Sequence, residues 1–183
     1  MKTILVPTDF SENADNAIMY ALEMNKKFNA KIILFHSYFI PVYAAEAPMN
    51  VPGLAELKND AMKSLEKVKV KINTSFPGNN FVIETSVSEG MPEDEIATIT
   101  EKEKPDMVIM GTKGAHGIRE ILIGTTTASV MKNIRCPIIA VPAEAKFKGI
   151  NKIVFATNYA ENDFENIESV IDFAKHYQAE VTI

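Results

Sequence analysis

The sequence predicts an α/β fold in which helices cover both faces of a parallel sheet. Short segments that are almost wholly apolar, such as residues 3–8 and 31–37, are typical of strands buried on both sides. Between them lie segments with helical periodicity: the apolar positions 54, 57, 61, 65, 68 and 72 follow a 3-4-4-3-4 spacing. Because strands and helices alternate along the chain, crossover connections should make the strands parallel.

Composition narrows the class of protein. The chain has 183 residues, 46% hydrophobic and 23% charged, with a net charge of −5. This is ordinary globular composition, and it argues against a disordered chain and against a binder of duplex nucleic acid or of an anionic membrane. No apolar run approaches the roughly 20 residues of a membrane span. A single cysteine, Cys136, excludes an internal disulfide, so we expect a cytoplasmic protein.

The first half of the chain reads as strand, helix, strand, loop and helix. After the strand at 3–8, Ser11 is expected to cap a helix whose first turn carries Glu12 and Asp15, where the helix dipole favours acids. The second strand, 31–37, is followed by a proline-rich loop over 40–53. The helix that starts at Leu54 should end before Pro77.

The next segments complete a domain. We expect strands at 81–87, 106–110 and 137–141, a helix that begins at Pro92 and a short helix over 125–133. A glycine-containing loop over 111–124 joins the fourth strand to the short helix. Five strands and four helices are therefore in place by residue 143.

The remaining residues repeat the beginning. A shift of 149 aligns residues 2–34 with 151–183 without a gap. The strand-helix-strand pattern matches throughout. Seven aligned pairs are identical: Ile4/Ile153, Thr8/Thr157, Glu12/Glu161, Asn13/Asn162, Ile18/Ile167, Lys26/Lys175 and Ala30/Ala179. We expect a complete domain over 1–143, a linker over 144–150 and the β-α-β start of a second, truncated copy over 151–183.

Several common sites are missing from the sequence. It has no phosphate loop of the form G-x-x-x-x-G-K-[ST], no G-x-G-x-x-G after the first strand and no G-x-S-x-G elbow. The three histidines lack metal-ligand spacing. Cys136 is expected to be a small buried hydrophobe, and His36 a hydrogen-bonded structural residue.

Two segments have features of a ligand site. The first is Met110-Gly111-Thr112-Lys113-Gly114, followed after nine residues by Gly124-Thr125-Thr126-Thr127. Glycines let backbone approach a ligand closely, and free N–H groups and hydroxyls at a helix N-terminus suit a phosphate, with charge from Lys113, Arg119 or His116. The alternative is a plain loop with turn glycines and a threonine cap.

The second segment is Pro7-Thr8-Asp9, at the carboxyl end of the first strand. Open α/β sheets bind ligands at this edge, where an aspartate can accept hydrogen bonds from a ribose or hold a metal-bound water. The alternative is an acid that pairs with the dipole of the helix it precedes.

Taken together, these motifs resemble the universal stress protein family. The resemblance rests on Val6-Pro7-Thr8-Asp9-Phe10-Ser11, on the spacing Gly111-x2-Gly114-x9-Gly124-Thr125, and on Cys136-Pro137-Ile138-Ile139-Ala140-Val141. It implies a five-stranded parallel sheet in the order 3-2-1-4-5, of the adenine nucleotide alpha hydrolase-like kind. In that order Asp9 and Gly111 lie side by side.

The resemblance also implies a nucleotide site, because the glycine motif marks the ATP-binding members. Asp9 would contact the ribose, and Ser37 would offer backbone to the adenine. Gly111 and Gly114 would allow close approach, while Gly124, Thr125 and Thr126 would hold the phosphates, often with Mg²⁺ or Mn²⁺. Pro7, Thr8, Met110 and Thr127 complete the predicted site.

The resulting expectation is a stress-response regulator that binds ATP, with ADP or AMP as alternatives, and hydrolyses it slowly at most. We expect one nucleotide per chain and a homodimer through the fifth strand. A competing reading is a nucleotide-free interaction module with a structural loop. A third, an adenylyl-transferring enzyme, would need a serine- and glycine-rich loop after the first strand, which Pro7 to Ser11 does not provide.

Overall fold

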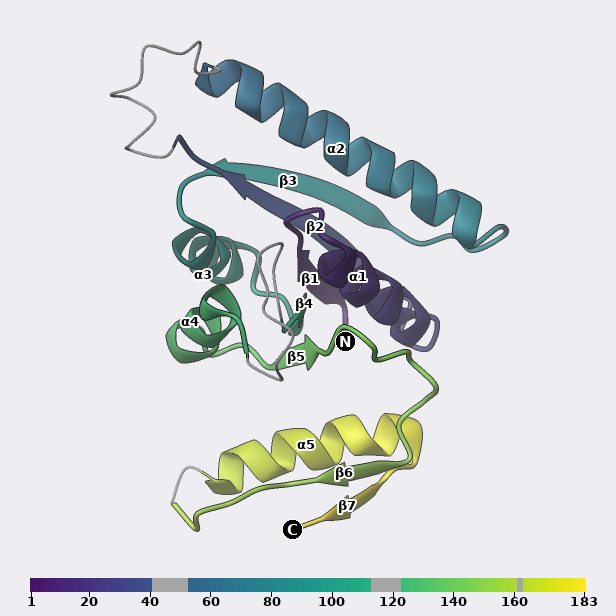
Figure 1. The fold of residues 1–183 in the computed structure, drawn as a ribbon. Helices are drawn as coiled ribbons and strands as arrows, with labels where there is room; N and C mark the ends of the chain where they lie inside the picture. Colours follow the sequence, from purple (N-terminus) through teal and green to yellow (C-terminus); the bar gives the residue numbers. More distant parts are fainter. Residues whose placement is uncertain (41–52, 113–122, 161–162) are drawn as a thin grey trace. The chain divides into compact units, whose positions relative to one another are not determined.

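The computed structural model describes residues 1–40, 53–112, 123–160 and 163–183. It divides the chain into two compact units, Met1–Lys146 and Phe147–Ile183 (Figure 1). The proline-rich segment predicted as a loop lies largely outside the described residues. Within these residues, no helix is long and apolar enough to cross a membrane.

The first unit is a five-stranded parallel sheet with helices on both faces (Figure 1). Its elements in chain order are β1 (Thr3–Pro7), α1 (Glu12–Asn25), β2 (Lys31–Tyr38), α2 (Leu54–Ser75), β3 (Ile83–Glu89), α3 (Pro92–Glu103), β4 (Met107–Gly111), α4 (Thr125–Asn133) and β5 (Ile138–Val141). The strand order is β3-β2-β1-β4-β5, which confirms the predicted fold class.

The apolar runs form the centre of the sheet. Residues 4–6 of β1, 32–35 of β2 and 107–110 of β4 are all buried, as expected for strands covered on both faces. One core cluster joins these strands to α3 and α4; it consists of Leu5, Ile33, Phe35, Ile96, Ile99, Val108, Met110 and Val130. This core fixes the positions of the strand ends, on which the candidate site depends.

Helix α1 begins as predicted. The Ser11 hydroxyl accepts a hydrogen bond from the Ala14 N–H at 3.2 Å, and Glu12 and Asp15 lie in the first turn. At its other end the buried carboxamide of Asn25 bonds to the backbone of Ala30, a role for Asn25 that the sequence analysis missed.

Two predicted features shift. The third strand runs from Ile83 to Glu89 rather than over 81–87. Phe81 precedes it and packs edge-on against Phe76, at the end of α2, with ring centroids 5.6 Å apart. In α2 the buried stripe starts at Ala61, and Leu54 is 40% exposed. The first two turns of α2 are thus largely exposed, with only Leu57 half-buried before Ala61.

The second unit contains β6 (Lys152–Val154), α5 (Asp163–Tyr177) and β7 (Glu180–Thr182). Its strands pair in parallel with the register Lys152↔Glu180, which is the β1–β2 pairing Thr3↔Lys31 displaced by 149 residues. The left-handed residues are displaced equally: φ is 62° at both Phe10 and Tyr159. The offset seen in the sequence therefore extends to backbone geometry.

Candidate functional site

The carboxyl ends of β1 and β4 lie next to each other in the sheet. β1 pairs with β2 on one side and with β4 on the other. The connection from β1 leads to β2 on one side, and the connection from β3 returns to β4 on the other, so the strand order reverses at β1. The pairing of Leu5 with Val108, continued along both strands, sets Thr8 opposite Gly111. Such a switch point is where open α/β sheets bind ligands. The structure thus brings together the ends of the two predicted segments.

The turn after β1 presents Asp9 at this edge. Pro7 and Thr8 are buried, whereas Asp9 is exposed. The Thr8 hydroxyl accepts a hydrogen bond from the Phe10 N–H at 3.0 Å, and Asp9 Oδ1 accepts one from the Ser11 N–H at 3.0 Å. These bonds hold a carboxylate on the surface directly beyond the strand.

The end of β2 adds Ser37 and His36. Ser37 is half-buried, pairs with Ser88 of β3 and shares the sheet face of Phe35, toward α3. His36 points to the opposite face, where its Nδ1 lies 2.8 Å from the carbonyl oxygen of Thr8. The predicted structural, hydrogen-bonded role of His36 is confirmed.

His36 also contacts the turn with its ring. The ring packs on Phe10 with centroids 4.4 Å apart. Burial lowers the pKa of His36, although the Thr8 carbonyl and the Asp9 charge oppose that shift. The sequence analysis did not predict that His36 contacts Phe10. The two residues are 26 positions apart, so no local sequence pattern indicates their contact. Only the expected adjacency of the first two strands could have suggested it.

The end of β4 is joined to the start of α4. Met110 is buried and Gly111 half-buried. The Thr127 hydroxyl donates to the carbonyl of Gly111 at 2.8 Å, and the Gly124 N–H donates to the carbonyl of Thr112 at 2.6 Å. The Thr127 hydroxyl hydrogen is therefore engaged in positioning α4, while Thr125 is exposed and Thr126 half-buried at the helix start.

The N-terminus of α4 has the electrostatic character of an anion site. Gly124 is the N-cap residue and makes no side-chain cap, and the first turn contains no acidic residue. The N–H groups of Thr125, Thr126 and Thr127 lack partners within the helix, and the helix dipole adds positive potential there. By contrast, α1 and α3 both carry acids in their first turns.

Gly114, Lys113, His116 and Arg119 lie outside the described residues. Among the residues that the structure does describe, no group of three or more His, Cys, Asp or Glu could hold a metal ion. Burial raises the pKa of Cys136 to about 11, so its thiol stays protonated at neutral pH, as suits a packing residue.

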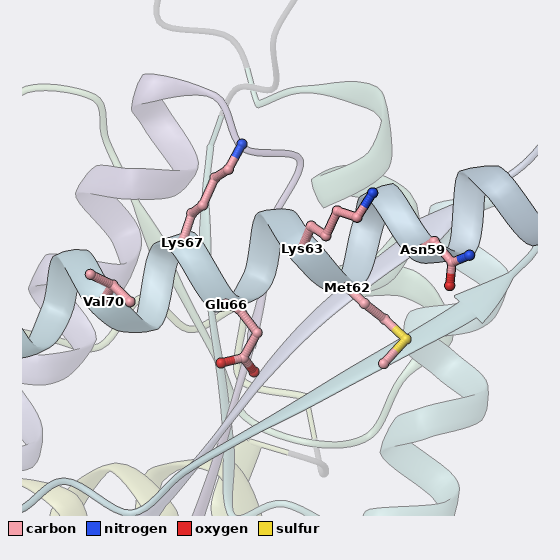
Figure 2. Close-up of a pocket in the computed structure, with 6 residues that line it drawn as sticks. All are labelled: Asn59, Met62, Lys63, Glu66, Lys67 and Val70. Carbon is pink, nitrogen blue, oxygen red and sulfur yellow. The ribbon is translucent and has the colours of Figure 1, made fainter.

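A second surface, on α2, has an apolar hollow. The outer face of α2 carries a shallow apolar hollow around Met62 and Val70, lined also by Asn59, Lys63, Glu66 and Lys67 (Figure 2). All six residues belong to one helix, so the hollow has no polar groups that converge from a second element. Ligand sites need such convergence, and the carboxyl edge of the sheet is the better candidate.

Comparison with known proteins identifies the family of the first unit. The sequence model of the universal stress protein family matches residues 1–142. Universal stress protein MJ0531 of Methanocaldococcus jannaschii is 32% identical over 147 residues, which are 79% of this chain and 84% of that protein.

Two solved structures have the same fold. A universal stress protein in complex with cAMP is 21% identical with a TM-score of 0.58 and covers 76% of this chain and 96% of its own. An Arabidopsis thaliana family member with AMP bound is 18% identical with a TM-score of 0.52 and covers 78% and 92%.

Proposed function

The chain belongs to the universal stress protein family, and from this premise we propose that it is a stress-response regulator that binds ATP in its first unit. The nucleotide would lie at the carboxyl edge of the sheet, between the Asp9 turn and the start of α4. We also infer a cytoplasmic location, in keeping with the single cysteine.

One observation carries the proposal: an exposed carboxylate and an uncapped helix N-terminus lie at the ends of adjacent strands. Asp9 would accept hydrogen bonds from the ribose hydroxyls, and the Ser37 backbone would face the adenine. The N–H groups after Gly124 and the hydroxyls of Thr125 and Thr126 would hold phosphate. Gly111 and Gly114 would let the backbone approach the nucleotide.

Adenine nucleotides are the favoured ligand class, because two proteins of the same fold were solved with cAMP and with AMP. The choice of ATP over ADP or AMP is our proposal. It is favoured by the spacing Gly111-x2-Gly114-x9-Gly124-Thr125, which resembles the glycine motif of the ATP-binding members of the family.

A metal ion would be bound chiefly through the nucleotide. The described residues offer no cluster of carboxylates and imidazoles, so Mg²⁺ or Mn²⁺ would take its ligands from phosphate oxygens, water and at most Asp9. We therefore expect the cation to bind together with the nucleotide, so that its affinity for the protein depends on the triphosphate.

Hydrolysis should be slow at most. Phosphoryl transfer needs a positioned water and compensating charge, and the described site supplies one carboxylate already bonded to the Ser11 N–H. We propose that ATP acts as a bound switch, with turnover far below the median enzyme rate of about 10 s⁻¹.

Residues 151–183 are proposed to be the start of a second copy of the domain, joined to the 1–143 copy by a linker over 144–150. The shared register and left-handed residues support this reading. Asn158 replaces Asp9 and lacks its charge, so we propose one nucleotide per chain, held in the first copy.

We further propose a homodimer through β5. This strand is at the end of the described sheet, with only β4 as its partner, and its outer edge could pair with a second chain. Native mass spectrometry would report the dimer and the nucleotide count together. A monomer, or two nucleotides per chain, would contradict these two proposals.

The nucleotide-free interaction module remains the second candidate, because Thr127 already uses its hydroxyl within the fold. Mass analysis of ligand released by denaturing the purified protein separates the two readings. As a directed test, Asp9→Asn should keep the bond to Ser11 but bind ATP about tenfold more weakly, measured by calorimetry, because hydrogen bonds to a charged acceptor are stronger by about 1.5 kcal/mol. Unchanged affinity would contradict the assignment of Asp9.

A further inference from the structure

We propose that His36 is a positioning residue that fixes Asp9 for ligand binding by holding the residues on either side of it. The inference rests on the proposed function for the identity of the ligand. His36 belongs to β2, and its own contacts are with the turn that follows β1.

The residue before Asp9 is held at both backbone groups. The Thr8 N–H donates to the carbonyl of Phe35 at 2.8 Å, continuing the ladder between β1 and β2. The Thr8 carbonyl accepts from His36 Nδ1 at 2.8 Å. Because a carbonyl can only accept, Nδ1 carries the hydrogen in this contact. Thr8 is only 7% exposed, so few other donors could replace the imidazole.

The residue after Asp9 is held by its side chain. Phe10 has φ of 62°, a conformation that costs a non-glycine residue about 1–2 kcal/mol. Its ring packs on the His36 ring at 4.4 Å, with 39° between the planes, and its N–H bonds to the Thr8 hydroxyl. With both neighbours fixed to one histidine, the Asp9 backbone has little freedom.

The equivalent turn in the second unit shows that the shape of the turn does not depend on a packed ring. There, Thr157 Oγ1 accepts from the Tyr159 N–H at 2.8 Å, and Asn158 Oδ1 accepts from the Ala160 N–H at 3.1 Å. Tyr159 has φ of 62°, like Phe10, yet it is 88% exposed. The turn thus forms without a packed ring, and the contribution of His36 in the first unit is to anchor a preformed turn to β2.

The anchor works as a neutral group. Burial lowers the pKa of His36, against the opposing influence of the Thr8 carbonyl and the Asp9 charge, which favours the neutral ring. Its effect on Asp9 is therefore exerted chiefly through the hydrogen bond to Thr8, because the equivalent turn in the second unit forms without a packed ring. This distinction allows a test with uncharged substitutions.

The test compares His36→Asn with His36→Phe. The asparagine amide places a donor near the position of Nδ1, whereas phenylalanine keeps the ring and loses the donor. We expect calorimetry with ATP to give an affinity within about threefold of wild type for His36→Asn and at least tenfold weaker for His36→Phe. A residue needed only for packing would give the reverse order. If His36→Phe does not fold, His36→Leu replaces it, because leucine also lacks a donor.

A double-mutant cycle shows whether His36 acts through Asp9. The variant Asp9→Ala/His36→Phe should bind no more weakly than Asp9→Ala alone. Losses that add fully would mean that His36 influences the ligand independently of Asp9 and would overturn the proposal.

A measurement without ligand separates this inference from the proposed function. The Ser11 N–H is bonded to Asp9 Oδ1, so its hydrogen exchange, followed by NMR, reports how well the carboxylate is held. Exchange should be faster in His36→Phe and unchanged in His36→Asn. If wild type binds no ATP, the proposed function fails. The exchange measurement then decides by itself whether His36 holds the Asp9 turn. Equal exchange in wild type and His36→Phe would overturn it.

Discussion

The buried carboxamide of Asn25 bonds both backbone groups of Ala30: Oδ1 accepts from the N–H at 2.8 Å, and Nδ2 donates to the carbonyl at 2.9 Å. These two bonds close the turn between α1 and β2. In the second unit Ala174 occupies the equivalent position, and the Ala179 N–H bonds instead to the backbone carbonyl of Ala174.

We therefore expect Asn25→Ala to lower the free energy of unfolding by about 1–3 kcal/mol, because it leaves buried groups of Ala30 without a partner. Urea denaturation measures the change. Asn59→Ala, at an exposed position of α2, is the matched control and should lie within about 0.5 kcal/mol of wild type. Equal stability of both variants would show that the Asn25 bonds are replaced by water.

Gly90 is expected to tolerate no side chain. Its φ is 147°, and a Cβ there would lie 2.6 Å from Oε1 of Glu95, whose carboxylate accepts from the Ser88 hydroxyl. Gly90→Ala should cost about 1–3 kcal/mol of unfolding free energy. Adding Glu95→Ala should recover the part of the loss due to the clash.

Two other glycines serve as controls for Gly90. Gly78 has φ of 84° and open space where a Cβ would lie, so Gly78→Ala should lower the free energy of unfolding through backbone strain alone. Gly53, the N-cap residue of α2, is in an ordinary extended conformation with open space, so Gly53→Ala should cost at most about 1 kcal/mol, through the poorer cap. A loss at Gly90 no greater than that at Gly53 would contradict the clash.

Asp106 should make stability depend on pH. Burial alone would raise its pKa, but the N–H groups of Lys2 and Thr3, bonded at 2.6 and 2.8 Å, lower it overall. A carboxyl whose folded pKa is depressed contributes stability above its unfolded pKa of about 3.9 and loses it as pH falls through the folded value.

Asp106→Asn should therefore be less stable than wild type at pH 7, by about 1 kcal/mol or less because the carboxylate is largely exposed. The difference should shrink below pH 4. Urea midpoints at several pH values measure it. A difference that is constant with pH would show that charge is not the cause.

A carboxylate at the start of α4 should affect stability and binding in opposite directions. Thr125→Glu complements the helix dipole and should stabilise the fold by about 0.3–1 kcal/mol. The same charge repels phosphate and should weaken ATP binding at least tenfold. Asn59→Glu adds an equal charge on α2 and should leave binding unchanged. Unchanged binding in Thr125→Glu would place the phosphates elsewhere.

Much of the fold could be predicted because its signals are local. The strands follow apolar runs, Ser11 caps α1, and Pro92 with its three acids starts α3. The adjacency of Asp9 and Gly111 depended on strand order, which came from family resemblance rather than from periodicity.

The contacts that position the site could not be predicted from local pattern. The His36 bond to Thr8 and the Thr127 bond to Gly111 join residues 28 and 16 positions apart. Nothing in the neighbouring sequence marks Phe10 as left-handed, since aromatic residues rarely adopt that conformation. These features arise from tertiary packing.

The matching turns at Phe10 and Tyr159 show that one backbone conformation accepts different side chains. Seven identities in 33 aligned positions are retained, yet the threonine hydroxyl and the left-handed residue recur at equivalent places. The turn tolerates aspartate or asparagine at its tip because either side chain accepts the same N–H bond. The backbone of this turn is therefore compatible with a charged or an uncharged side chain at its tip, so a change of charge there need not alter its conformation.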